Sequence, residues 1–305
     1  MRALPFPRRI NVELTNHCNQ RCTLCPRLGF TRPLGFMDPA LFERVARECG
    51  RHETSLWLHF LGESLLHRQA LALIRRAKDL GVHQVGLSTN GVSLAAVTDG
   101  LLASGLDRLE CSMDAADPES YRAMRGRDHY RRVVSAVEHF LARKRERGLE
   151  RPVTSIQFMR TPEVERSLPE LVGRWRPLLG PRDFVMTIEA ASFGGAVAEA
   201  SPRLHPGSGP RPPCPWLSEA LVVLQDGTVT MCGADWDAKA PIGSLTEASL
   251  EEIWNGAEME RRRSAHRRGR FGDVPLCGGC RDWRLADGSG YRNALEEVGV
   301  AAASR

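Results

Sequence analysis

From residue 9 to about residue 190, short apolar runs alternate with longer stretches in which apolar residues recur at helical spacing. The apolar runs predict strands at Ile10–Thr15, Ser55–Phe60, Gln84–Thr89, Arg108–Met113, Pro152–Met159 and Asp183–Glu189. The stretches between them predict helices at Pro39–Cys49, Leu66–Leu80, Leu94–Ser104, His129–Arg147 and Glu165–Leu178. Such alternation is typical of a parallel sheet wrapped by helices. Because it stops short of the eight units of a closed barrel, we expect an α/β fold with a partial (β/α)6 TIM-type barrel.

The second part of the chain follows a different pattern. Residues 192–215 are rich in Gly, Pro, Ser and Ala, which is typical of a linker. Ala220–Leu224 and Thr228–Met231 flank an Asp226-Gly227 turn, which predicts a β-hairpin, and a helix is expected at Leu250–His266. We therefore expect a barrel at 1–195, a linker at 196–213, a small hairpin-plus-helix domain at 214–290 and a tail at 291–305.

Composition narrows the class of protein. The 305 residues are 42% hydrophobic and 26% charged, which suits a buried core and excludes a largely disordered or fibrous chain. There is no apolar run of about eighteen residues and no signal-peptide pattern, so we expect a cytoplasmic protein without a membrane partner. The net charge of +5 is modest. Nine cysteines are many, and in a reducing compartment clustered cysteines ligate metals more often than they form disulfides.

Three cysteines, Cys18, Cys22 and Cys25, follow the first predicted strand. Three thiolates at this spacing can ligate three corners of a [4Fe–4S] cluster and leave one iron open. A structural zinc site would need four closed ligands. His17 is adjacent to Cys18 and badly placed to supply the fourth, so the spacing favours the cluster.

Four more cysteines, Cys214, Cys232, Cys277 and Cys280, form a second group in the second part of the chain. The predicted hairpin and helix separate them, and together they can fully ligate a second cluster. A zinc ribbon is the alternative.

Short motifs after the first cysteine group resemble those of the radical S-adenosylmethionine (SAM) superfamily. Leu61-Gly62-Glu63 resembles the motif that holds the SAM amino group, Ser88-Thr89-Asn90-Gly91 ends the third strand as a similar motif does there, and Cys111-Ser112-Met113-Asp114 resembles a Ser-x-Asp motif. The departures are Leu24, where an aromatic residue is usual, and Leu61, where glycine is usual. The resemblance implies SAM contacts at Gly62, Glu63, Ser88, Asn90, Ser112 and Asp114.

The second cysteine group resembles the SPASM/twitch extension of the same family, which carries auxiliary [4Fe–4S] clusters. Ile242–Leu245 and Leu250–Trp254, between its cysteines, belong to this resemblance. Four cysteines match the smaller twitch form with one cluster. The resemblance implies SAM and two [4Fe–4S] clusters as cofactors, with metal ligands at Cys18, Cys22, Cys25, Cys214, Cys232, Cys277 and Cys280.

The resemblance also implies a reaction. In this family the reduced first cluster splits SAM into methionine and a 5′-deoxyadenosyl radical, which takes a C–H hydrogen. One auxiliary cluster suits a one-electron acceptor, so we expect oxidation of a secondary alcohol of an aminocyclitol or amino sugar to a ketone. Within the family the chain is similar to the 2-deoxy-scyllo-inosamine dehydrogenases and related aminoglycoside-pathway enzymes. This implies an oxidoreductase of antibiotic or other natural-product biosynthesis.

Four other functions are open. An aminoglycoside epimerase would need a thiol as hydrogen donor, and the unassigned cysteines are Cys49, expected to be a packing residue, and Cys111, which strand alternation places opposite Ser112 and Asp114. Peptide-modifying enzymes often carry a leader-binding domain, for which the 17 residues before Cys18 leave no room. A molybdenum-cofactor cyclase is disfavoured because the sequence ends without Gly-Gly. A non-catalytic sensor would not need the SAM motifs.

Strand alternation places further polar side chains inside the barrel, at Glu13, Thr15, His59, Ser88, Asn90, Ser155, Gln157, Thr187 and Glu189. His59 and Glu189 are the candidate catalytic proton acceptors, with a structural hydrogen bond or a SAM contact as the alternative for each. The basic stretch Arg261–Arg270 is interpreted as a solvated helix face, and docking of an acidic electron donor such as flavodoxin or ferredoxin is the second interpretation. It lacks interleaved aromatic residues, so we expect a small-molecule substrate and no nucleic acid.

Overall fold

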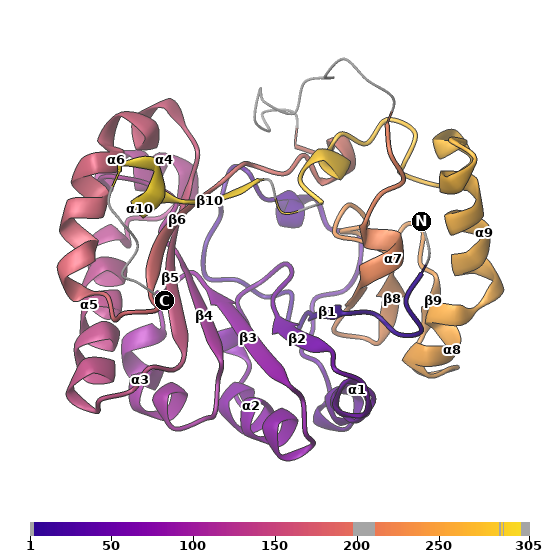
Figure 1. The fold of residues 1–305 in the computed structure, drawn as a ribbon, viewed down its shortest axis with the longest axis horizontal. Helices are drawn as coiled ribbons and strands as arrows, with labels where there is room; N and C mark the ends of the chain where they lie inside the picture. The colour runs from indigo at the N-terminus through magenta and orange to yellow at the C-terminus, as the bar shows by residue number, and fades with distance from the viewer. Residues whose placement is uncertain (1–2, 198–210, 287, 289, 300–305) are drawn as a thin grey trace.

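A curved sheet organises the molecule (Figure 1). The computed structural model describes all residues except 1–2, 198–210, 287, 289 and 300–305. The sheet has ten strands in the order β10-β6-β5-β4-β3-β2-β1-β7-β8-β9. Its parallel strands are β1 (Arg9–Val12), β2 (Ser55–Leu58), β3 (Gln84–Thr89), β4 (Arg108–Ser112), β5 (Val153–Met159) and β6 (Phe184–Ile188). The predicted six-stranded partial barrel is therefore confirmed.

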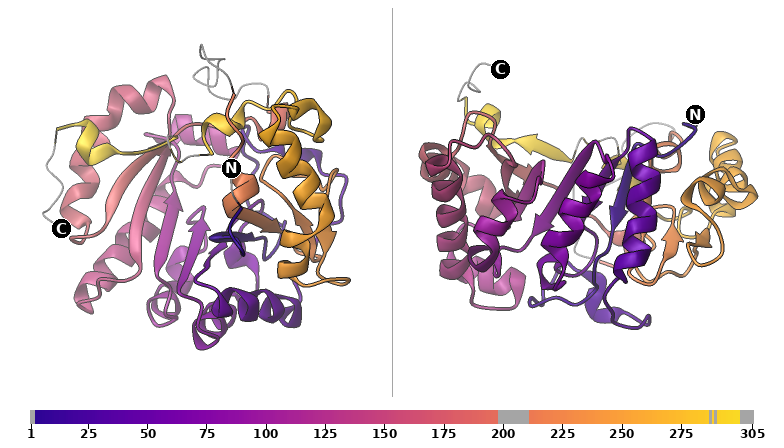
Figure 2. Two further views of the ribbon diagram at one scale, coloured as in Figure 1. Left: turned by 45° about the vertical axis from the view of Figure 1, so that its right-hand side comes forward. Right: turned by 90° about the horizontal axis from the view of Figure 1, so that it is seen from below.

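Helices cover the outer side of these strands, as Figures 1 and 2 show. They are α1 (Pro39–Arg51), α2 (Ala70–Asp79), α3 (Leu94–Leu102), α4 (Pro118–Arg125), α5 (Tyr130–Glu146) and α6 (Pro162–Trp175). Three of them begin with a capping residue followed by proline. The side chains that accept hydrogen bonds from the first helical turn are those of Asp38, Asp117 and Thr161. The pattern of apolar residues missed α4, which has only eight residues.

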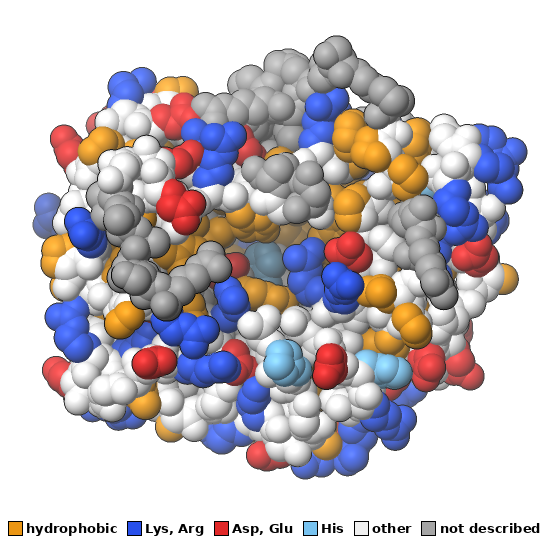
Figure 3. Space-filling model, viewed as in Figure 1, with side chains coloured by type: hydrophobic (Ala, Val, Ile, Leu, Met, Phe, Trp, Pro, Cys, Tyr) orange, Lys and Arg blue, Asp and Glu red, His pale blue; other side chains and the backbone are white. Residues whose placement is uncertain are grey.

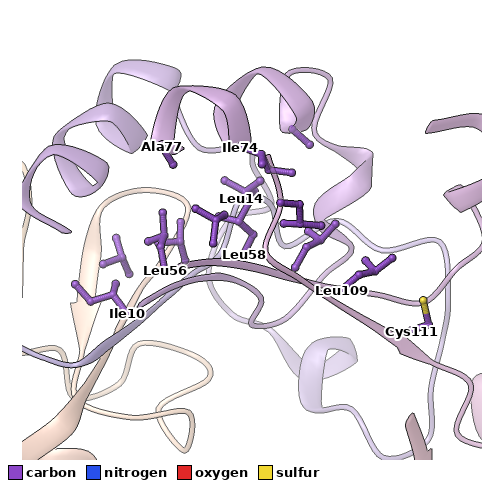
Figure 4. Close-up of a cluster of buried hydrophobic side chains, with 14 of the residues drawn as sticks. Ile10, Leu14, Leu56, Leu58, Ile74, Ala77, Leu109 and Cys111 are labelled. Carbon is purple, nitrogen blue, oxygen red and sulfur yellow. The ribbon is translucent and has the colours of Figure 1, made fainter. Parts of the chain in front are cut away.

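The apolar core lies between the sheet and these helices (Figure 4). Leu56 and Leu58 of β2 point into it, and Leu109 and Cys111 of β4 do the same. Cys111 is 1% exposed, so the prediction that it faces the helices is confirmed. Cys49 is also buried in this core, as expected for a packing residue.

The predicted hairpin continues the barrel sheet. β7 (Ala220–Val223) pairs in parallel with β1, and β8 (Thr228–Thr230) and β9 (Gly243–Ser244) follow in antiparallel order. All four residues of β7 are buried, which is typical of a strand covered on both faces. The helices here are α7 (Trp216–Glu219), α8 (Leu250–Asn255) and α9 (Ala257–Arg267). The single helix expected at 250–266 is wrong, because Gly256 has an extended conformation with ψ of 162° between α8 and α9.

The basic stretch is only partly a solvated face. Arg263 is buried in α9, donates from Nε to the Leu217 carbonyl at 2.8 Å, and stacks 4.1 Å from the ring centre of Trp254. Arg262 is buried too, and Arg261 pairs with Glu258 at 2.8 Å. Consecutive arginines therefore point in different directions, because a helix distributes neighbouring side chains around its axis.

The C-terminal segment is also folded where a tail was expected. β10 (Tyr291–Asn293) pairs antiparallel with β6 and leads into α10 (Ala294–Glu297). Arg160 fastens this segment, because it forms an ion pair with Glu297 at 2.6 Å. Most of the predicted linker lies outside the described residues.

Single 3₁₀ turns lie at Pro26–Gly29, Ser64–Leu66, Arg176–Leu178, Phe193–Gly195, Phe271–Asp273 and Asp282–Arg284. None of the described helices has the length and apolar character needed to cross a membrane.

Candidate active site

Both cysteine groups face one cavity of about 460 Å³, on the inner side of the curved sheet. Figure 3 shows its opening as a hollow near the middle of the molecular face. Its lining includes the cysteines Cys18, Cys22, Cys25, Cys214, Cys232 and Cys280. Residues far apart in the sequence thus converge on one cavity.

The end of α4 holds the loop that carries the first cysteine group. The Arg21 and Thr23 amides donate to the carbonyls of Arg125 and Met124 at 3.0 and 2.9 Å. Gly126 ends the helix with φ of 66°, and a Cβ there would lie 2.5 Å from the Arg21 carbonyl oxygen. The helix α4, which was not predicted from the sequence, therefore fixes the position of the cysteine loop.

Donors surround the thiols of the first group. Cys18 Sγ lies 3.7 Å from Asn90 Nδ2, and Cys22 Sγ lies 3.6 Å from Arg125 Nη1. Burial raises the pKa of Cys18, and it raises the pKa of Cys25 to about 11, with the neighbouring thiolates adding to both shifts. Three clustered thiols of this kind fit an iron–sulfur cluster, whose binding replaces their protons.

Gly62 and Glu63 join the end of β2 to its neighbours. Glu63 accepts hydrogen bonds from Thr89 Oγ1 at 2.8 Å and from the Asn90 amide at 2.7 Å, and burial raises its pKa. Gly62 has φ of 96°, and a Cβ there would lie 2.2 Å from the Thr15 carbonyl oxygen. The structure therefore brings Gly62, Glu63 and Asn90 together beside the first cysteine group.

The Ser-x-Asp motif ends β4 next to a buried arginine. Asp114 Oδ2 pairs with Arg125 Nη2 at 2.7 Å, and Arg125 also donates to the Ser112 carbonyl. Asp114 Oδ1 is buried without a hydrogen-bond partner in the described part of the chain, and the carboxyl lies next to Gln157. Ser88, for which a SAM contact was expected, also lines the cavity and donates to Glu110 Oε2 at 2.7 Å.

Polar side chains form the floor of the cavity. His59 lines it with an exposed side chain, and desolvation by the surrounding protein, with a smaller effect of the Arg9 charge, lowers its pKa. Burial raises the pKa of Glu110. Asn11 Oδ1 is buried and unpartnered among the described residues, and Tyr291 enters from β10. Glu110 shares the face of β4 that carries Ser112 and Asp114, as strand alternation indicates, whereas Asn11 and Tyr291 were not predicted, although the alternation of β1 could have indicated Asn11.

Glu189 borders the cavity but faces Arg160, with Oε1 at 3.3 Å from Nε. The expectation that Thr187 points inward is wrong, because Arg160 Nη1 donates to its hydroxyl at 3.2 Å on the side of α10. Ile188 lines the cavity instead, in register with Met159 of β5. The strand was predicted in the correct place with its two faces exchanged.

Glu13 and Thr15 were expected to line the inside of the barrel, but neither is among the residues that line the cavity. Both oxygens of Glu13 pair with Arg32 at 2.6 Å, and Arg32 reaches Gln225 Oε1 at 3.1 Å. Thr15 Oγ1 donates to the Gly35 carbonyl at 2.6 Å. These bonds fasten the segment after the first cysteine group to the second part of the chain.

Ser155 and Gln157 share the inner face of β5. Ser155 is buried, while Gln157 lines the cavity. The predicted alternation on this strand is therefore confirmed.

The second cysteine group is held by backbone and side-chain contacts. The Cys214 amide donates to His266 Nδ1 at 3.3 Å. Burial raises the pKa of Cys277 to about 12, and both burial and the neighbouring Cys214 and Cys277 raise that of Cys232. Four thiols that influence one another in this way provide one ligand for each iron of a [4Fe–4S] cluster. Across the described ranges, no three His, Cys, Asp or Glu side chains are arranged to hold a single metal ion.

A parallel partial barrel whose cavity receives two cysteine groups defines an iron–sulfur enzyme fold. Residues 12–170 match the radical SAM superfamily, and residues 214–281 match an iron-sulfur cluster-binding domain named SPASM. The chain belongs to the radical SAM superfamily. The two domains imply two iron–sulfur clusters and SAM as cofactors.

Curated relatives match the barrel part of the chain. A probable GTP 3′,8-cyclase of Methanothermobacter thermautotrophicus is 30% identical over 131 residues, which are 42% of this chain and 42% of that protein. The GTP 3′,8-cyclase of Streptomyces coelicolor is 31% identical over 145 residues, which are 46% of this chain and 41% of that protein. The chain thus matches less than half the length of these relatives.

Solved structures resemble nearly the whole fold. BtrN in complex with AdoMet and 2-DOIA has a TM-score of 0.61 at 19% identity, over 92% of this chain and 94% of that chain. Streptococcus suis SuiB bound to precursor peptide SuiA has a TM-score of 0.69 at 15% identity, over 86% of this chain and 68% of that chain. At these sequence identities the similarity to the solved structures shows a shared fold and nothing more specific.

Proposed function

We propose that this protein is a radical SAM dehydrogenase that oxidises a secondary alcohol of an aminocyclitol or amino sugar to a ketone in natural-product biosynthesis. The observation that carries the proposal is the single cavity lined by both cysteine groups, with His59 and Glu110 on its floor. The fold shared with BtrN, whose structure holds AdoMet and 2-DOIA, supports the same class of substrate.

In this proposal Cys18, Cys22 and Cys25 hold the first cluster, and Cys214, Cys232, Cys277 and Cys280 hold the second. When bound, the first cluster and SAM supply a carbon-centred radical that removes a C–H hydrogen, and the second cluster supplies a one-electron acceptor. Asp114 is assigned a contact to SAM, and Ser88 orients Glu110. An acidic electron donor such as flavodoxin or ferredoxin provides the first electron. The remaining SAM contacts are assigned to Gly62, Glu63, Asn90 and Ser112.

We assign His59 the role of accepting the proton of the substrate hydroxyl. Its lowered pKa keeps the ring neutral at pH 7, so that a ring nitrogen is an unprotonated, weakly basic acceptor for that proton. We expect His59→Gln to lower the rate of ketone formation about 10²- to 10⁴-fold. Since the neutral base is fully present above its pKa, the wild-type rate should stay level between pH 5.5 and 8. Glu189, the other candidate acceptor, is engaged by Arg160.

Rates of ketone and 5′-deoxyadenosine formation, measured side by side against pH, check this assignment. SAM cleavage should persist in His59→Gln while ketone formation is lost. A wild-type rate that falls with an apparent pKa of 6 to 7, or a His59→Gln variant with the wild-type rate, contradicts the role.

We assign Glu110 the role of binding the amino group of the substrate. Its carboxylate lies on the cavity floor with the unpartnered Asn11 oxygen, and both are acceptors for an ammonium group. Hydrogen bonds to a charged group contribute about 1.5–3 kcal/mol, so Glu110→Gln should raise KM about 10- to 100-fold. A substrate analogue with hydroxyl in place of the amine is the control, because its KM should not change. An equal change for both compounds would refute the assignment.

An anaerobic assay tests the proposed function. Amino sugars and aminocyclitols labelled with deuterium at the hydroxyl-bearing carbon are incubated with reduced protein and SAM. We expect deuterium in 5′-deoxyadenosine and a product that has lost two hydrogen atoms. A product at the oxidation level of the substrate that carries a solvent hydrogen in place of the deuterium would identify an epimerase, and turnover of GTP or of a peptide alone would also overturn the proposal.

The structure offers an observation against epimerisation. All nine cysteines are described, and the two outside the cysteine groups, Cys49 and Cys111, lie in the apolar core. Neither faces the cavity to donate a hydrogen atom to a substrate radical.

A further inference from the structure

Arg211 lies against the second cysteine group, and the proposed reaction gives it no task. Its Nη1 donates to the Cys277 carbonyl at 2.6 Å. Its guanidinium carbon stands 4.3 Å from the ring centre of Phe271 and 5.6 Å from that of Trp283. Two aromatic rings and a ligand's backbone therefore fix this cation in place.

The charge of Arg211 acts on the cysteines around it. Arg211 stands three residues before Cys214 in the sequence, and its bond to the Cys277 carbonyl places the guanidinium at the backbone of a second ligand. Its Nε is buried without a hydrogen-bond partner in the part of the chain that is described. A cation held in place beside these ligands favours added negative charge at the whole site.

Reduction adds one electron to an iron–sulfur cluster, so a fixed neighbouring cation stabilises the reduced form. Cluster potentials respond to net charge, to hydrogen bonds near the sulfurs and to solvent exposure. We propose that Arg211 raises the reduction potential of the cluster held by the second cysteine group. The direction suits an electron acceptor. The proposal rests on the assignment of these cysteines to a cluster, and it does not depend on the substrate.

The test is a redox titration of the reconstituted full-length protein, followed by electron paramagnetic resonance. We expect Arg211→Gln to lower the equilibrium constant for reduction of the second cluster at least tenfold, which is a negative shift of about 59 mV for one electron. The first cluster serves as the internal reference, and its potential should stay unchanged. Iron content is measured in every sample.

Two variants separate charge from shape. Arg211→Lys keeps the charge and should stay near the wild-type potential. Arg268→Gln removes an exposed charge after α9 and should leave both potentials unchanged. If Arg211→Gln loses iron, Arg211→Met is used, because its long apolar side chain can still fill the space between the rings.

The outcomes are distinct. A wild-type potential in Arg211→Gln with full iron content overturns the proposal, and so does an equal shift in Arg211→Lys. Loss of the second cluster in every Arg211 variant, Lys included, would show that Arg211 positions ligands instead. A wild-type protein with only one cluster would refute the cluster assignment in the proposed function.

Discussion

Replacing Cys18, Cys22 and Cys25 with alanine will halve the iron content, from about eight to about four per chain, because one of two [4Fe–4S] clusters is lost. The same variant will release no 5′-deoxyadenosine when reduced with dithionite in the presence of SAM. The three thiols line one cavity, and their loop is fixed by the end of α4. Iron analysis after anaerobic reconstitution, together with chromatography of the SAM products, measures both effects.

Two controls make this result specific. Cys111→Ala removes a thiol that lies in the apolar core and should leave iron content and SAM cleavage at wild-type values. Cys214→Ala/Cys277→Ala should also lower iron to about four per chain, yet it should still release 5′-deoxyadenosine. Zinc in place of iron, or SAM cleavage by the triple variant, would contradict the assignment of the first group.

Arg125→Met will destabilise the fold by about 3–5 kcal/mol, the cost of leaving a buried charge without its partner. Arg125 and Asp114 form an ion pair at 2.7 Å with side chains 7% and 11% exposed, and the same guanidinium contacts Cys22 Sγ. Urea unfolding of the iron-free protein measures the change without interference from cluster loss.

The matched control for this substitution is Arg122→Met, on the exposed side of the same helix. We expect it to change the free energy of unfolding by no more than about 0.5 kcal/mol. Adding Asp114→Asn to Arg125→Met should recover part of the loss, because the unpaired carboxylate is removed. Equal effects of Arg122→Met and Arg125→Met would show that the ion pair does not contribute as described.

Local spacing was enough to predict the first cysteine group, and the SAM motifs, each a few residues long, were indicated by resemblance to the family. Cys18, Cys22 and Cys25 stand within one loop, and Ser112 and Asp114 end one strand, so their relation is already present in the sequence. The six parallel strands followed from the alternation of apolar runs with helical stretches for the same reason. These features depend on few residues and on short separations.

Features that depend on tertiary packing were missed or misplaced. Thr187 points toward α10, because the pairing of β6 with β5 sets its faces, and the composition of β6 does not reveal that pairing. Tyr291 reaches the cavity only because β10 joins β6. Arg125 resembles any exposed helical arginine in the sequence, and burial beside Asp114 is what gives it a role.

The pairing of β7 with β1 and of β10 with β6 has a consequence for biosynthesis. A newly made barrel of six strands has two unpaired edges, and such edges attract other chains. In this fold β7, which covers one edge, lies between Cys214 and Cys232, and β10, which covers the other, follows Cys280. Protection of the barrel against aggregation is therefore delayed until the segment that carries this group has been synthesised and folded, and the outermost strands, β9 and β10, are then only two and three residues long.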